Sequence, residues 1–105
     1  MTDAGPQNEP VLKRFRAAVA EVYGDRLQRV ILYGSRARGE HQRDSDYDIA
    51  VFIKHAGSFY DESGRLAAIT TDILEDTGAA TPFAAGAYQE HSGFMHELRK
   101  DGLDL

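Results

Sequence analysis

Several features are missing from this chain of 105 residues, and each absence excludes a class of protein. There is no cysteine, which excludes disulfides, zinc ribbons, iron–sulfur sites and thiol nucleophiles. Acidic residues outnumber basic ones by 17 to 12, and the net charge of −5 argues against a protein that coats nucleic acid or binds a membrane surface. The longest apolar run, from Ile49 to Ile53, is far shorter than the roughly 20 residues of a membrane span.

The composition that remains is typical of one small globular domain. Hydrophobic residues make up 42% of the chain, which is too many for a disordered protein. A domain of this length should have a radius of gyration of about 13 Å. The first residues lack the basic and apolar stretches of a signal peptide, so we expect a cytoplasmic protein. We expect residues 1–8 to form a flexible leader and residues 9–105 a single domain.

Apolar periodicity and turn residues predict the helices and strands. The predicted helices are Pro10 to Gly24, a short turn within 37–45, Tyr60 to Asp76 with Gly78 as its cap, and Ser92 to Arg99. The predicted strands are Arg29 to Tyr33, Asp46 to Ile53 and Thr81 to Tyr88; proline, glycine and alanine dilute the last one, which we therefore expect at a sheet edge. This order predicts an α/β (α+β) fold with a small mixed sheet of three strands, or four, flanked by helices.

Two carboxylates at the start of the second strand form the first half of a candidate site. Asp46 and Asp48 are two apart, so in a strand they would point to the same side, roughly 6–7 Å apart along it. Carboxylates in this arrangement can converge on one divalent cation or bridge two. Taken alone, the pair is equally compatible with charges that keep a strand end soluble.

The pair Gly34-Ser35 forms the second half. A glycine and a serine between a strand and a helix start expose backbone N–H groups and a hydroxyl, which readily hold a phosphate. Gly34 would let the phosphate approach the main chain, and Ser35 would donate a hydrogen bond. A phosphate-binding turn followed by a carboxylate pair on the next strand supplies the parts that metal-assisted phosphoryl or nucleotidyl transfer requires.

Together these motifs resemble the signature of the minimal nucleotidyltransferases, small members of the DNA polymerase β-like superfamily. The resemblance covers Gly34 to Gly39 and Ser45 to Val51, within residues 30–53. It implies a nucleotidyltransferase fold that binds Mg²⁺ and a nucleoside triphosphate and transfers a nucleoside monophosphate to an acceptor hydroxyl. Many members are similar to antitoxins whose toxin is a helical HEPN-domain ribonuclease, in modules where the transferase adenylylates a toxin tyrosine.

Carried over onto this sequence, the resemblance gives roles to named residues. Gly34 and Ser35 would hold the β- and γ-phosphates, and Asp46 and Asp48 would ligate Mg²⁺ and support catalysis. Arg36 and Arg38 would neutralise phosphate charge, unless they are ordinary solvated arginines. The implied substrate is ATP and the implied partner is a HEPN-domain toxin or another acceptor protein, with no direct binding to DNA or membrane. So small a site is expected to be completed by a partner chain, in a complex or a homo-oligomer.

One part of the family pattern is missing from the sequence. The family usually has a third carboxylate on a neighbouring strand, which completes the metal site and can activate the acceptor. The predicted strand from Thr81 to Tyr88 has no acidic residue, and Glu90 just beyond it is the remaining candidate. Acidic residues of the preceding helix, Glu62 among them, are interpreted as surface charges.

Three functions therefore remain open. The first is an enzyme that transfers AMP to a partner protein, and the second is a weak or inactive member that neutralises a toxin by binding. A transferase for small metabolites is the third, but 105 residues leave no second domain to form an acceptor cleft. The aromatic residues do not help to decide, because Phe94, Tyr33 and Tyr47 are interpreted as core, rim or packing residues. His91 and His96 are five apart, off one helical face, so we expect no metal between them.

Overall fold

The structure is a computed structural model that describes residues 5–40 and 46–105. Its elements, in chain order, are the 3-10 helix η1 (Pro6–Asn8), α1 (Pro10–Tyr23), η2 (Gly24–Arg26), β1 (Leu27–Tyr33), α2 (Ser35–Arg38), β2 (Tyr47–Ile53), α3 (Phe59–Ile73), β3 (Gly78–Ala84), η3 (Ala85–Gln89), α4 (Gly93–Asp101) and β4 (Leu103–Asp104). Within these ranges, no helix combines the length and the apolar character that a membrane crossing needs. The radius of gyration is 13.2 Å, close to the predicted value.

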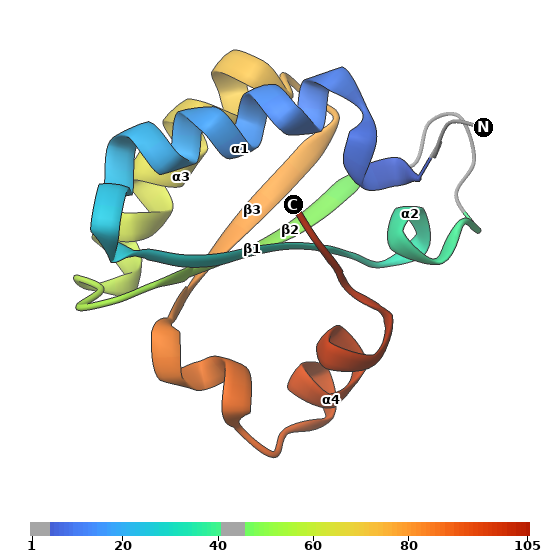
Figure 1. Ribbon diagram of the computed structural model, residues 1–105. Helices are drawn as coiled ribbons and strands as arrows, with labels where there is room; N and C mark the ends of the chain where they lie inside the picture. The colour runs from blue at the N-terminus through green and yellow to red at the C-terminus, as the bar shows by residue number, and fades with distance from the viewer. Residues whose placement is uncertain (1–4, 41–45) are drawn as a thin grey trace.

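Four strands form one mixed sheet in the order β3-β2-β1-β4. β1 runs antiparallel to β2 and to β4, whereas β2 and β3 are parallel and are joined by α3. Helices α1 and α3 cover one face of the sheet, and η3 and α4 lie against the other (Figure 1). The predicted mixed α/β fold is confirmed, and the two-residue β4 supplies a fourth strand.

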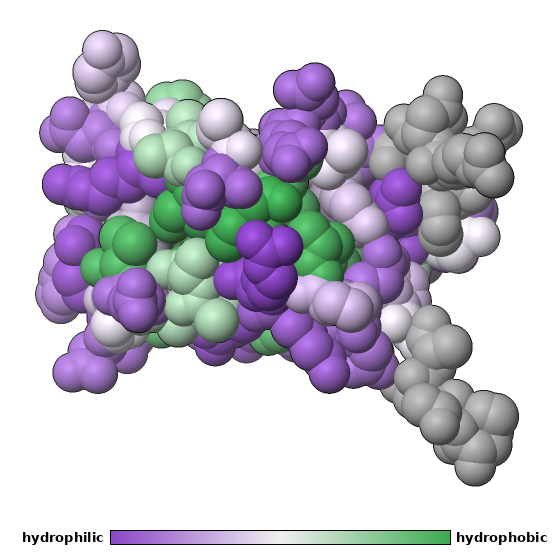
Figure 2. All heavy atoms as spheres, turned by 90° about the horizontal axis from the view of Figure 1, so that it is seen from above, coloured by the Kyte–Doolittle hydropathy of each residue, from purple (hydrophilic) through white to green (hydrophobic). Residues whose placement is uncertain are grey.

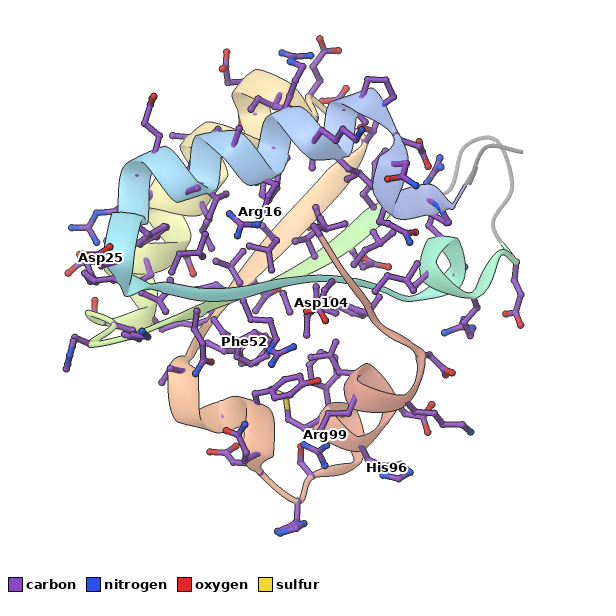
Figure 3. The ribbon with its side chains drawn as sticks, in the orientation of Figure 1. Arg16, Asp25, Phe52, His96, Arg99 and Asp104 are labelled. Atoms are coloured by element: carbon purple, nitrogen blue, oxygen red, sulfur yellow. The ribbon has the colours of Figure 1, made fainter. Side chains whose placement is uncertain are left out.

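The sheet has a core on each face because its central strands alternate. Towards α1 and α3, side chains from both helices pack on those of β1 and β2, among them Leu12, Phe15, Leu66, Leu32 and Ile49. Towards α4, the smaller core contains Ile31, Ala50, Phe52, Met95 and Leu98. Figure 3 shows Phe52 pointing from the sheet towards η3 and α4. Seen from above, apolar residues occupy the middle of the helical face and hydrophilic ones surround them (Figure 2). Strand β2 is thus buried on both sides and gives a rigid base to the residues at its start.

The third strand begins and ends earlier than predicted. It spans Gly78–Ala84, and the residues from Ala85 on form η3 instead of continuing the strand. Gly78 therefore starts β3 and does not cap α3, whose C-cap is Leu74. A Cβ atom at position 78 would lie only 3.0 Å from the backbone oxygen of Tyr47, so glycine permits the close approach of the two strands. The predicted edge position is confirmed.

The prediction that Glu62 is a surface charge is wrong. Its side chain is 1% exposed, and it lies one turn before the buried Leu66 on the inward side of α3. Its carboxylate accepts hydrogen bonds from the Gly57 N–H, the Tyr23 hydroxyl and the guanidinium groups of Arg26 and Arg65. Gly57 and Arg65 are close to Glu62 in sequence, but Tyr23 and Arg26 come from a distant part of the chain, so the full set of partners could not be predicted from the local pattern.

Two local expectations fall partly on residues that the structure does not describe. Of the expected leader, residues 1–4 lie outside the described part, and Pro6–Asn8 form η1. The expected short turn within 37–45 begins earlier, since α2 spans Ser35–Arg38, and residues 41–45 also lie outside the described part.

Candidate functional site

Gly34 forms the turn between β1 and α2 (Figure 1). Its backbone angles, φ 78° and ψ −159°, belong to a region that only glycine enters readily. A Cβ atom added to Gly34 would lie 2.6 Å from Oδ2 of Asp48. Strand pairing explains the contact, because Tyr33, the residue before Gly34, lies opposite Asp48 in the β1–β2 register. The structure thus brings the glycine turn and the carboxylate motif together.

The two carboxylates lie at the start of β2. Asp48 is the second residue of the strand and is half-buried, while Asp46 precedes the strand and is exposed. Burial raises the pKa of Asp48, and the negative charge of Asp46 raises it further. The ionised pair is therefore destabilised in the free protein, and a divalent cation would offset this cost. Mg²⁺ commonly takes one or two carboxylates together with phosphates and waters, so the two residues fit such an ion.

Asp48 pairs with Tyr33 of β1 on one side and with Ala79 of β3 on the other, and Thr81 is the β3 residue that pairs with Ala50. Tyr33 of β1 forms a hydrogen bond with the side chain of Thr81 of β3, across the intervening β2. Burial raises the pKa of Tyr33, and the charge of Asp48 raises it further, which keeps the hydroxyl protonated at neutral pH. Sequence analysis missed Thr81 and treated Tyr33 as a packing residue. The contact between Tyr33 and Thr81 spans three strands, so no local sequence pattern predicts it.

The two arginines of the motif lie in different surroundings. Arg36 is buried, and its guanidinium lies 4.1 Å from the centre of the Tyr47 ring. Tyr47 points into the core beneath α1, on the face of the sheet opposite to Asp48. Arg38 ends α2, is exposed and forms an ion pair with Glu40. The structure therefore places Arg36 away from the face that Asp48 occupies and leaves Arg38 accessible; phosphate contacts of both stay predictions.

Strand β3 places no carboxylate beside Asp48. Its residue opposite Asp48 is Ala79, and Gly78–Ala84 contains no acidic residue. Glu90 is exposed beyond η3, where its backbone oxygen accepts a hydrogen bond from Arg99. His96 points outward from α4 (Figure 3). Among residues 5–40 and 46–105, no three His, Asp or Glu side chains gather in a group that could hold a metal ion. Asp46 and Asp48 are thus the two carboxylates that the described site offers.

A family model and two curated proteins match the chain. The model of the nucleotidyltransferase domain matches residues 12–93. The two proteins come from Methanocaldococcus jannaschii and are named "Putative protein adenylyltransferase MJ0141" and "Putative protein adenylyltransferase MJ0604". They are 39% identical over 44 residues and 40% identical over 43 residues, which is 42% and 41% of this chain. The matches span only 44% and 43% of the relatives' own lengths.

Two solved structures have a similar fold. One, described as a "putative nucleotidyltransferase" from Sulfolobus solfataricus, has a TM-score of 0.67 and 22% identity and covers 90% of this chain and 75% of that one. The other, described as "the toxin-antitoxin with AMP-PNP", has a TM-score of 0.64 and 18% identity and covers 88% and 70%. At these identities the likeness concerns the fold alone.

Proposed function

The chain belongs to the nucleotidyltransferase domain family, and from this premise we propose that it transfers AMP from ATP to a hydroxyl group of a partner protein, with Mg²⁺. In this reaction the acceptor oxygen bonds to the α-phosphorus and pyrophosphate leaves. The name protein adenylyltransferase, carried by both curated relatives, supports AMP as the transferred group and a protein as the acceptor. We place the reaction in the cytoplasm, where ATP and Mg²⁺ are both abundant.

The observation that carries this proposal is the contact between Gly34 and Asp48. It sets the main chain of a turn suited to phosphate directly against a carboxylate suited to a cation. A metal–triphosphate complex needs both partners side by side, because the cation is shared between carboxylate and phosphate oxygens.

Each residue of the site would act through its position. The main-chain N–H groups at Gly34 and Ser35 and the Ser35 hydroxyl would bind the β- and γ-phosphates. Asp46 and Asp48 would hold Mg²⁺, which when bound polarises the α-phosphate and neutralises charge on the departing pyrophosphate. Arg38 would reach the phosphates by exchanging Glu40 for them. Arg36 would have to leave the Tyr47 ring to do so, and we therefore propose that it supports the start of β2 instead.

We propose that the partner is a HEPN-domain toxin and that the chain is its antitoxin. The solved neighbour described as a toxin-antitoxin with AMP-PNP supports a toxin partner and an adenine nucleotide. The exposure of Asp46 at the start of β2 also supports a partner, since another chain could then supply both the acceptor hydroxyl and the remaining wall of the site.

A second candidate function is neutralisation of the toxin by binding alone. It is favoured by the position opposite Asp48, where alanine stands in β3 and a third carboxylate would complete the site. Loss of a residue that activates the acceptor typically lowers the rate about 10²–10⁴-fold. Binding of Mg²⁺ and nucleotide needs no such residue, so it would survive in both candidates.

Calorimetric titration with ATP, with and without Mg²⁺, tests the site. The wild type should bind ATP only when Mg²⁺ is present, and Asp46→Asn/Asp48→Asn should lose this binding while staying folded. The matched control, Asp72→Asn/Asp76→Asn, removes the same charge from exposed positions and should bind as the wild type does. Equal binding by all three proteins would show that the carboxylate pair is no metal site.

Mass spectrometry of a HEPN-domain toxin separates the two candidate functions. After incubation with the chain, ATP and Mg²⁺, a transferase leaves the mass of an adenylyl group on the toxin and releases pyrophosphate. A toxin that is inhibited but unmodified would instead support the binding protein. If the chain alone does not bind ATP, the titration is repeated with the toxin present. Absence of ATP binding in that titration as well would refute the nucleotide site itself.

A further inference from the structure

Phe94 is an aromatic residue that is only partly buried. It lies in the first turn of α4, and its side chain is 42% exposed although it joins an aromatic cluster. Its ring meets that of Tyr33 edge to face, with centroids 5.3 Å apart, and stacks on that of Phe83 at 5.7 Å. The Ser92 hydroxyl caps the helix by accepting a hydrogen bond from the Met95 N–H. The ring is thus held on two sides and open on the rest.

The contact with Tyr33 places Phe94 beside the candidate site. Tyr33 directly precedes Gly34 and lies opposite Asp48, so a single ring separates Phe94 from the carboxylate. Phe94 therefore lies near the Gly34 turn without occupying the position where phosphates would bind.

A second, independent observation shows which way this side of α4 faces. Phe94, Glu97 and Asp101 are three and seven residues apart, so they share one side of the helix. A hydrogen bond with Glu40 raises the pKa of Arg38, and the charges of Asp101 and Glu97 raise it further. Because Arg38 ends α2, the side of α4 that carries Glu97 and Asp101 lies within electrostatic range of α2. Figure 1 shows α2 and α4 towards the same end of the molecule.

We infer that the exposed part of the Phe94 ring is the platform on which the nucleobase of the bound nucleotide stacks. This inference rests on the proposed function and adds the place of the base to that of the phosphates. In a nucleoside triphosphate the ribose separates the base from the phosphates, so the base must bind at some distance from the phosphates and the cation. Phe94 lies at such a distance from Asp48, because the Tyr33 ring lies between them. Base stacking on an aromatic ring is strong enough that truncating the ring to alanine typically weakens binding roughly 5- to 150-fold.

The exposed ring of Phe59 gives a matched control. It is 67% exposed and begins α3, next to Pro82, Phe83 and Ala84 at the far end of β3 from the residue that pairs with Asp48. Truncation of Phe59 removes an aromatic ring of the same size from the surface but leaves the candidate site intact.

The experiment compares ATP with inorganic tripolyphosphate, which has the phosphates but no base, both with Mg²⁺. Phe94→Ala should bind ATP roughly 5- to 150-fold more weakly than the wild type and bind tripolyphosphate equally well. Phe94→Leu, which keeps most of the buried volume, should show the same selective loss even if the alanine variant unfolds. Phe59→Ala should bind both ligands as the wild type does.

A tryptophan reporter provides a direct readout, because the chain contains no tryptophan. In Phe94→Trp, ATP should quench the indole fluorescence by stacking and tripolyphosphate should not, while Phe59→Trp should respond to neither. Equal loss of ATP and tripolyphosphate in Phe94→Leu, or ATP binding that leaves Trp fluorescence at 94 unchanged, would overturn the inference. Shielding of the tryptophan at position 94 by a partner protein but not by ATP would also overturn the inference. If the wild type binds neither ligand, either alone or with the toxin present, the proposed function itself fails and the platform with it.

Discussion

Gly34 and Gly39 both have positive φ angles, 78° and 74°, but only Gly34 touches the candidate site. A Cβ atom on Gly39 would meet nothing within 4 Å, whereas one on Gly34 would collide with Asp48. We expect Gly34→Ala to lower the free energy of unfolding by roughly 2–4 kcal/mol and to abolish Mg²⁺–ATP binding, and Gly39→Ala to cost roughly 1 kcal/mol and to bind normally. Denaturant unfolding and calorimetry measure both effects. Equal costs and retained binding in the two variants would show that the close approach at Gly34 has no function.

Glu62 is the residue whose charge state should dominate the acid stability of the fold. Burial alone would raise its pKa, but hydrogen bonds from Gly57, Tyr23 and Arg65 outweigh burial and lower the pKa from 4.5 to about 2. A carboxyl group with a lowered folded-state pKa stabilises the fold above its unfolded-state pKa and loses this contribution as the pH falls through the folded value. The contribution of Glu62 is therefore complete above about pH 4.5 and disappears by about pH 2.

Glu62→Gln should remove most of this acid dependence. We expect the variant to be roughly 2–4 kcal/mol less stable than the wild type at pH 7, and the difference to shrink as the pH falls from 4.5 towards 2. Glu21→Gln, at an exposed position of α1, should track the wild type throughout. Urea unfolding at a series of pH values measures the difference. A gap that stayed constant with pH would mean that the carboxylate is not ionised in the folded protein.

At the scale of elements, the sequence predicted best where apolar spacing was strong and worst where small residues dominate. Helix α1 and strand β2 have regular or continuous apolar residues, and their predicted ends lie within a residue of the observed ones. Strand β3 begins Gly78-Ala79-Ala80, which has little intrinsic strand propensity, and its position is set by pairing with β2. The shift matters for the site, because the true strand puts Ala79 beside Asp48.

The position of Ala79 suggests a gain-of-function variant. Ala79→Asp would place a third carboxylate opposite Asp48, where it could accept the proton of the acceptor hydroxyl. We expect the rate of pyrophosphate release in the presence of the proposed toxin partner to rise roughly tenfold or more, part of the 10²–10⁴-fold that such a residue can contribute. Ala84→Asp, an exposed position at the other end of the strand, should leave the rate unchanged. A folded Ala79→Asp protein that is no faster than the wild type would show that the missing carboxylate does not limit the reaction.

For the molecule as a whole, the motif predicted the halves of the site, but their surroundings depend on long-range packing. Gly34 and Asp48 could be predicted because each belongs to a local pattern next to a strand. Other features depend on contacts between elements far apart in the sequence: the contacts of Tyr33 with Thr81 and with Phe94, and the hydrogen bond from Tyr23 to the buried Glu62. The burial of Arg36 could not be predicted either, because it depends on the contact with Tyr47, which packs in the core beneath α1.

The melting temperature of the whole protein should show whether the carboxylate pair serves function or stability. Two repelling carboxylates at the start of a buried strand destabilise the free protein, so Asp46→Asn/Asp48→Asn should melt at the same temperature as the wild type or higher. Mg²⁺–ATP at a hundred times its dissociation constant should stabilise the wild type by about 2.7 kcal/mol, which raises Tm by roughly 10–20 °C for a domain of this size. The double variant should show no such rise, and neither protein should respond to ATP without Mg²⁺. Scanning calorimetry gives both numbers, and a free double variant that melts well below the wild type would mean that the two aspartates hold the fold together.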